Sequence, residues 1–266
     1  MKRREFLVSS LAGVTALGVS AGAQAASQAD PRPDPAAPAK GKILIAGGRY
    51  DTKWIGYMAK LTGKRRPKLL FIAPASFDRP EGVVRWFENC APLDVEASFQ
   101  PSAIATATEK RGWDEILLSV DGIVVSGGNT LNQQAIWKAH GIDAILRQAW
   151  ERGIVLGGAS AGSLAWFEEG TTDSRAKELS TVQCLGFIKG SHSPHYDGEK
   201  NRRPFYQNAV ATGLLKPGYA CDNNAGIYFE GGTAKRFLSA QPGSNVYRVS
   251  ASGGQVVETI VPTESF

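Results

Sequence analysis

The stretch that decides the fold is Gly153–Gly162, which reads GIVLGGASAG. It joins a short apolar run to the motif G-x-S-x-G, and the residues up to Phe167 continue at helix-compatible spacing. A strand that runs into such a serine and on into a helix is typical of a nucleophile elbow. The flanking glycines are needed because side chains there would clash with the strained turn. An ordinary glycine-rich turn has the same letters, so the motif alone leaves both interpretations open.

Apolar runs of the same kind occur earlier in the chain, and patterns with helical spacing separate them. Continuous apolar runs indicate strands that are covered on both faces, which predicts a parallel sheet. The expected strands are residues 42–48, 68–74, 95–99, 122–128 and 154–157, and the expected helices are residues 54–61, 82–90, 131–140 and 142–152. This alternation predicts a doubly wound α/β domain whose ligands bind at the carboxyl ends of the strands.

The pattern changes after residue 191, where short apolar segments are separated by glycine and proline. These segments are residues 226–229, 236–239, 246–249 and 255–260. We expect them to form an antiparallel C-terminal extension of a mostly parallel sheet.

The N-terminus has the composition of an export signal. It begins Lys2-Arg3-Arg4, continues with a short apolar stretch, and reaches small residues at Ala23-Gln24-Ala25. We expect a twin-arginine signal peptide at residues 1–25, a Pro/Ala-rich linker at 26–41 and a single domain at 42–266. The protein would then be periplasmic or secreted, without stable membrane insertion after signal cleavage. A retained membrane anchor is the alternative.

Composition excludes several classes of function. The net charge is +5, but no basic run follows Lys64-Arg65-Arg66, so a nucleic-acid surface is poorly supported. The three cysteines, Cys90, Cys184 and Cys221, are too scattered for a disulfide framework or a metal site, although one pair could oxidise. We expect no metal ion and no organic cofactor.

A serine nucleophile needs a base, and the chain has three histidines. His140 precedes Gly141 at a predicted helix end, where an imidazole commonly serves the helix C-terminus. His192 and His195 share one segment, and Pro194 stiffens the chain ahead of His195. The residues alone favour His195 and leave His192 open.

The base also needs a group that orients it, and the oxyanion needs N–H donors. Backbone N–H groups at Gly127-Gly128 and at Ala161, directly after Ser160, could be those donors. The candidates for the orienting group are Asp173, Asp197, Asp222 and Asn223. Asp197 is close to His195 along the chain, which disfavours it.

The chain resembles the peptidase E family of aspartyl dipeptidases over nearly all of residues 42–266. These proteins are serine hydrolases with a fold similar to class I glutamine amidotransferases. The resemblance is densest in five blocks, residues 125–130, 158–168, 172–174, 193–197 and 218–226.

The family places Ser, His and an acid in that order along the chain. Carried onto this sequence, the resemblance implies Ser160 as nucleophile, His195 as base, and the N–H groups of Gly128 and Ala161 as oxyanion donors. The third member falls at Asp222 or Asn223. Relatives carry an acid at the position of Asn223, so we expect Asp222 to take the role, alone or together with Asn223.

The resemblance also implies a serine-type dipeptidase or exopeptidase acting on dipeptides or short peptides, with N-terminal Asp preferred, and the N-terminal signal predicts that this enzyme is exported. Asn129 and Arg203 would bind the substrate, since an arginine after the histidine segment holds its carboxylate in the family. Alternatives are a cyanophycinase-like hydrolase of β-aspartyl-arginine linkages and a catalytically weakened binding protein. The expected partner is a small peptide, with no nucleic acid, and the expected state is a monomer or homodimer.

Overall fold

The computed structural model describes residues 41–103 and 108–266. The predicted signal peptide and all but the last residue of the predicted linker lie outside the described residues. Within the described ranges, no helix is long and apolar enough to cross a membrane.

The larger sheet of the described chain has eight strands in the order β14-β11-β10-β1-β5-β4-β2-β3. Its parallel part consists of β1 (Lys42–Ala46), β5 (Val155–Ala159), β4 (Gly122–Val125), β2 (Lys68–Ile72) and β3 (Glu96–Gln100). Beyond β1 lie β10 (Ala225–Glu230) and β11 (Thr233–Ser239), which are antiparallel, and the short β14 (Glu264–Ser265). The predicted α/β class, with a mostly parallel sheet extended by antiparallel strands, is confirmed.

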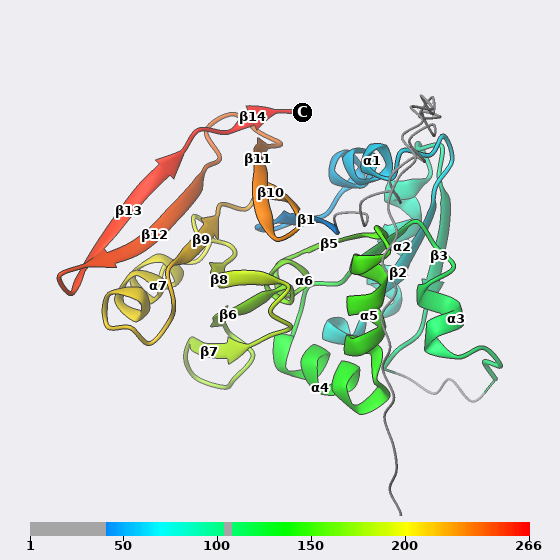
Figure 1. Ribbon diagram of the computed structural model, residues 1–266, viewed down its shortest axis with the longest axis horizontal. Coiled ribbons are helices and arrows are strands. Elements are labelled where there is room, and N and C mark those ends of the chain that lie inside the picture. Colours follow the sequence, from blue (N-terminus) through cyan, green and yellow to red (C-terminus); the bar gives the residue numbers. More distant parts are fainter. Residues whose placement is uncertain (1–40, 104–107) are drawn as a thin grey trace, which may run out of the picture. The chain divides into compact units, whose positions relative to one another are not determined.

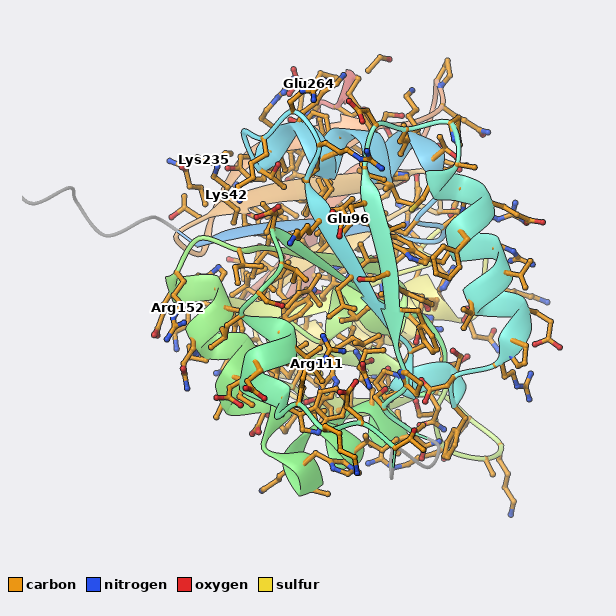
Figure 2. The ribbon with its side chains drawn as sticks, turned by 90° about the vertical axis from the view of Figure 1, so that its right-hand side faces the viewer. Lys42, Glu96, Arg111, Arg152, Lys235 and Glu264 are labelled. Carbon is orange, nitrogen blue, oxygen red and sulfur yellow. The ribbon has the colours of Figure 1, made fainter. Side chains whose placement is uncertain are left out.

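Helices cover both faces of this sheet. Side chains alternate along β1, so that Ile43 and Ile45 belong to one buried apolar cluster and Leu44 and Ala46 to another. The first cluster includes side chains of α3 (Trp113–Leu117), α4 (Thr130–His140) and α5 (Ile142–Glu151), and the second includes those of α1 (Thr52–Leu61) and α2 (Pro80–Cys90). In Figure 2, α2 and the green helices lie on opposite sides of β3, whose first residue is the labelled Glu96.

A second sheet, which the sequence did not predict, has six strands in the order β13-β12-β9-β8-β6-β7. Its members are β6 (Phe167–Thr172), β7 (Ser180–Gln183), β8 (Ile188–Ser193), β9 (Gly218–Cys221), β12 (Val246–Ser252) and β13 (Gln255–Val261). Two of the expected C-terminal strands, β12 and β13, therefore pair here rather than with β11. Figure 1 shows them (orange and red) beside α7 (Arg202–Ala211), which contacts both.

The helix after Ser160 is shorter than expected. α6 spans Ala161–Leu164, and Phe167 already begins β6. The carbonyl groups of Ala165, Trp166 and Phe167 accept hydrogen bonds from the backbone of residues 185–188 instead of from later helical N–H groups. Pairing with that segment ends the helix after one turn.

Candidate active site

Ser160 lies on a strained turn between β5 and α6. Its backbone has φ 58° and ψ −121°, a conformation that a residue with a side chain rarely adopts. Its neighbours require glycine: a Cβ atom at Gly158 would lie 2.5 Å from the carbonyl oxygen of Val125, and one at Gly162 would overlap the same oxygen. The half-exposed serine thus has the geometry of a nucleophile elbow.

The carboxyl end of β1 brings three of the expected residues together through backbone hydrogen bonds. The N–H of Ser160 donates to the carbonyl of Ala46 at 3.3 Å, and the N–H of His195 donates to that of Gly47 at 3.3 Å. The N–H of Gly48 donates to the carbonyl of Asn223 at 3.0 Å. Three consecutive residues therefore hold Ser160, His195 and Asn223 at one edge of the sheet.

His195 has one ring nitrogen engaged and the other available. Its Nδ1 lies 2.6 Å from Oδ1 of Asn223, and since that oxygen only accepts, Nδ1 carries the proton. The neutral ring then has an unprotonated Nε2, which is the form a general base requires. Among the described residues, Ser160 Oγ has no hydrogen-bond partner; such contacts commonly shorten only when substrate binds.

Asn223 is clamped in this position. A Cβ atom at Gly48 would lie 2.5 Å from Oδ1 of Asn223, and one at Gly198 would overlap its Nδ2. The backbone N–H of Asn223 donates to Oδ1 of Asp197 at 2.8 Å. Two glycines and one carboxylate thus fix the amide that faces His195.

Asp222 does not share this contact, contrary to expectation. Its Oδ2 accepts from the N–H of Asn245 at 2.7 Å and from Tyr247 Oη at 3.5 Å, and the side chain is buried. Burial raises the pKa of this carboxyl above its ordinary value. β9 ends at Cys221, and Asn223 lies in the turn that the hydrogen bond from the N–H of Ala225 to the carbonyl of Asp222 closes. In this turn the side chain that contacts the imidazole is that of Asn223.

His192, the alternative base, is a core residue. Its Nε2 lies 3.0 Å from Ser163 Oγ and its Nδ1 lies 3.0 Å from the carbonyl oxygen of Tyr219. The ring stacks on Phe167 with centroids 4.7 Å apart. Complete burial lowers the pKa of His192 to about 3, so the ring stays neutral. Because both ring nitrogens are engaged and the ring has no solvent contact, His192 has a structural role: it holds Ser163 in α6, directly after the nucleophile elbow.

The two expected oxyanion donors come from two segments that meet at Ser160. Gly128 has φ 131°, and a Cβ atom there would overlap the carbonyl oxygen of Ala75. Its neighbour Gly127 approaches the serine so closely that a Cβ atom would lie 3.7 Å from Ser160 Oγ. Ala161 is the first residue of α6, where the N–H has no intrahelical partner. Both N–H groups are thus in the neighbourhood where an oxyanion would form.

The two expected substrate-binding side chains have partners within the protein. Oδ1 of Asn129 accepts from the N–H of Asn132 at 2.9 Å, which caps α4, and its Nδ2 donates to the carbonyl of Ser174 at 3.1 Å. Arg203 forms an ion pair with Glu258 of β13 and lies over the ring of Tyr247 at 4.9 Å. A substrate carboxylate would have to displace Glu258 to reach this guanidinium.

The remaining candidates have structural surroundings. Asp173 is exposed and lies 3.9 Å from the buried Arg202, which also pairs with Glu199 at 2.6 Å. Cys221 is a buried free thiol whose pKa burial raises far above its ordinary value, and Cys90 and Cys184 are free as well. Within the described chain, no group of three metal-ligating side chains occurs.

Sequence reasoning missed a cavity of about 490 Å³ beside the serine. Gly48, Gly127 and Ala159 line it, together with the cations Arg49 and Arg85. Arg49 directly follows the two glycines after β1, and a cation in a strand-to-helix turn was the sequence signal that could have indicated this cavity. Arg85 comes from α2, and its place in the sequence gives no such signal.

A strained serine, a histidine with an available Nε2 and the nearby backbone N–H groups at the carboxyl edge of a doubly wound sheet are typical of a hydrolase site. Comparison with known sequences identifies the class more closely. The profile of Peptidase family S51 matches residues 43–237, and the chain belongs to this family of peptidases.

Relatives and solved structures agree with this assignment. The chain is 35% identical over 213 residues to the "Uncharacterized peptidase YgaJ" of Bacillus subtilis (strain 168), covering 78% of this chain and 89% of that protein. A peptidase from an acI-B1 Actinobacterium superposes with a TM-score of 0.63 at 13% identity, over 85% of this chain and 96% of that one. A putative peptidase E protein from Listeria monocytogenes EGD-e gives 0.55 at 16% identity, over 84% and 100%. The predicted resemblance to peptidase E is confirmed.

Proposed function

We propose that this protein is a serine exopeptidase that releases the N-terminal residue, with aspartate preferred, from dipeptides or short peptides. The observation that carries the proposal is the hydrogen bond between His195 Nδ1 and Asn223 Oδ1, which leaves Nε2 free at the edge where Ser160 lies. Membership of Peptidase family S51 supports it.

The chemistry follows from these groups. Ser160 Oγ attacks the scissile carbonyl while its proton passes to His195 Nε2. The N–H groups of Gly128 and Ala161 stabilise the oxyanion. The imidazolium then gives its proton to the leaving amine, and water, activated by the same nitrogen, hydrolyses the acyl-enzyme.

Asn223 determines how efficiently these reaction steps proceed. In a serine protease, replacing the orienting carboxylate by an amide costs about 10⁴ in kcat because the histidine takes the wrong tautomer. Here Oδ1 faces Nδ1, so the useful tautomer is kept. What the amide lacks is the negative charge that stabilises the imidazolium.

The decisive test is turnover by the mature chain of a dipeptide library, with Ser160→Ala as the blank. Asp-Leu should be among the best substrates, and a fluorophosphonate should label Ser160. Hydrolysis that survives in Ser160→Ala would refute the proposal. Preferential cleavage of β-Asp-Arg would instead favour a cyanophycinase-like hydrolase.

A catalytically weakened binding protein is the second candidate, and the amide at Asn223 favours it. Such a protein would bind Asp-Leu with equal affinity in the wild type and in Ser160→Ala, without turnover or labelling. Folded protein that neither cleaves nor labels would decide for this candidate.

We also propose export by the twin-arginine route, on the strength of Lys2-Arg3-Arg4 and the apolar stretch that follows. Replacing Arg3 and Arg4 by lysine should retain the protein in the cytoplasm. Unchanged fractionation of this variant would refute the proposal.

A further inference from the structure

The cavity beside Ser160 is lined by residues that are next to the reacting groups. Ala159, which lines it, is the residue before Ser160. A Cβ atom on the lining residue Gly127 would lie 3.7 Å from Ser160 Oγ, and one on Gly48 would lie 2.5 Å from Asn223 Oδ1. With a volume of about 490 Å³, the cavity is in the size range of small-ligand sites.

Two cations with no partner line this cavity. Arg49 and Arg85 are exposed, and neither forms a hydrogen bond or an ion pair within the described chain. Other arginines do pair: Arg203 binds Glu258, and Arg236 binds Glu264. Because a guanidinium binds a carboxylate in a planar, charge-assisted geometry, two free ones beside a nucleophile suit an anionic ligand.

The rest of the lining balances these cations only in part, because one carboxylate is present for two guanidiniums. Of the described lining residues, Asp51 is the one carboxylate, and its Oδ1 already accepts the N–H groups of Lys53 and Trp54 to cap α1. Ser126 adds a buried Oγ that has no hydrogen-bond partner.

Part of the remaining wall is apolar, and Tyr50, Ser76 and Asn89 add polar groups to it. Phe71 and Trp86 stack with centroids 5.4 Å apart and line the same cavity. A wall that combines this apolar surface with free cations suits a short peptide that carries a carboxylate.

We propose that Arg49 and Arg85 bind a carboxylate of the peptide whose bond Ser160 cleaves, so that this cavity, rather than the region of Arg203, sets the preference for an acidic substrate. The inference rests on the proposed peptidase function. The carboxylate is either the side chain of an N-terminal aspartate or the C-terminal carboxylate of a dipeptide, and both present the same group to the two guanidiniums.

The test compares Arg49→Gln, Arg85→Gln and the double variant with the wild type on three substrates. Asp-Leu has both carboxylates, Asn-Leu lacks that of the side chain, and Asp-Leu-amide lacks the C-terminal one. Arg79→Gln is the matched control, since Arg79 is exposed just before α2 but does not line the cavity.

We expect each single variant to lower kcat/KM for Asp-Leu about 10-fold or more, as for the loss of a charge-assisted hydrogen bond. The loss should disappear for whichever analogue lacks the bound carboxylate, which identifies its source. Arg79→Gln should match the wild type. Equal losses on all three substrates, or variants that match Arg79→Gln, would overturn the inference.

A binding measurement separates this inference from the proposed function. Calorimetry of Asp-Leu with Ser160→Ala, with and without the two arginine substitutions, reports on the cavity without turnover. Weaker binding on loss of the arginines supports the inference even if the wild type proves inactive. Hydrolysis that depends on Ser160 but is indifferent to both arginines would keep the function and overturn the inference.

Discussion

Replacing Asn223 by aspartate should increase turnover, because it supplies a charge that the present site lacks. The side chains have the same shape, and within the described chain Nδ2 of Asn223 donates no hydrogen bond that the change would break. In the Asn223→Asp variant, a carboxylate oxygen would take the place of the amide oxygen now 2.6 Å from His195 Nδ1.

The size of the gain follows from Coulomb's law. Charges about 4 Å apart attract by roughly 4 kcal/mol at an effective dielectric constant of 20, and by roughly 1 kcal/mol in water. His195 and Asn223 are half exposed, so the value lies between these limits. The carboxylate of Asp197, which accepts the N–H of Asn223 at 2.8 Å, reduces it by repulsion. We therefore expect about 1–2 kcal/mol of transition-state stabilisation, an increase in kcat of about 5- to 30-fold.

Initial rates of dipeptide hydrolysis at pH 8 measure this increase, with the rate of fluorophosphonate labelling as a second readout. Asn224→Asp is the matched control, because Asn224 is the next residue and its Nδ2 binds Gln241 instead of the imidazole. A folded Asn223→Asp protein with unchanged or lower kcat would refute the assigned role of Asn223. So would an equal increase in Asn224→Asp.

Four further results are expected. Burial lowers the pKa of His192 from 6.5 to about 3, so the unfolded chain binds the additional proton and stability is lost as the pH falls below 6.5. Urea unfolding should show a loss of about 2 kcal/mol between pH 7 and pH 5 from this group, and a His192→Gln variant with the same pH dependence would contradict it. Gly162→Ala should destabilise the fold by about 1–3 kcal/mol and abolish labelling of Ser160, since its Cβ overlaps a backbone oxygen. Gly56→Ala in α1 meets Leu93 only at 3.4 Å and should stabilise by up to about 1 kcal/mol, as thermal denaturation would show. Arg203→Ala should leave the KM for Asp-Leu within about twofold, because Glu258 already binds that guanidinium, and loss of this exposed ion pair should change the stability of the protein little. A large rise in KM would show instead that Arg203 binds the substrate carboxylate.

The parallel sheet was predictable because its strands are buried on both faces. The runs 43–46 and 123–125 are apolar at every position, and such runs give a strong signal in one sequence. The glycine-flanked serine was less clear by itself, since an ordinary glycine-rich turn has the same letters, and the resemblance to peptidase E favoured the nucleophile.

The second sheet was not predictable by the same reasoning because its interior is partly polar. Thr171 and Ser193 are buried and lie 2.8 Å apart through their hydroxyl oxygens, and His192 and Arg202 are buried as well. These side chains are stable inside only because each finds a partner, and hydrophobic periodicity does not register such pairs.

Sequence reasoning could not decide which of the two neighbours, Asp222 or Asn223, contacts His195. The turn after β9 directs Asn223 to the imidazole and Asp222 to the N–H of Asn245, and hydrophobic periodicity carries no information about such a turn. The arginines at the cavity were hidden for another reason: they lie 36 positions apart, and only the fold brings them to one wall.

Main-chain atoms of three consecutive residues, Ala46, Gly47 and Gly48, set the positions of the nucleophile, the base and its amide partner relative to one another. Replacing side chains of β1 preserves these main-chain hydrogen bonds as long as the backbone of the strand does not move. Inserting a single residue after Ala46 would instead displace two of the three groups by one step relative to the first. A protein altered in this way would retain its sheets, but its nucleophile and base would no longer be aligned. Insertion would therefore give a folded, inactive enzyme in which every reacting group is still present.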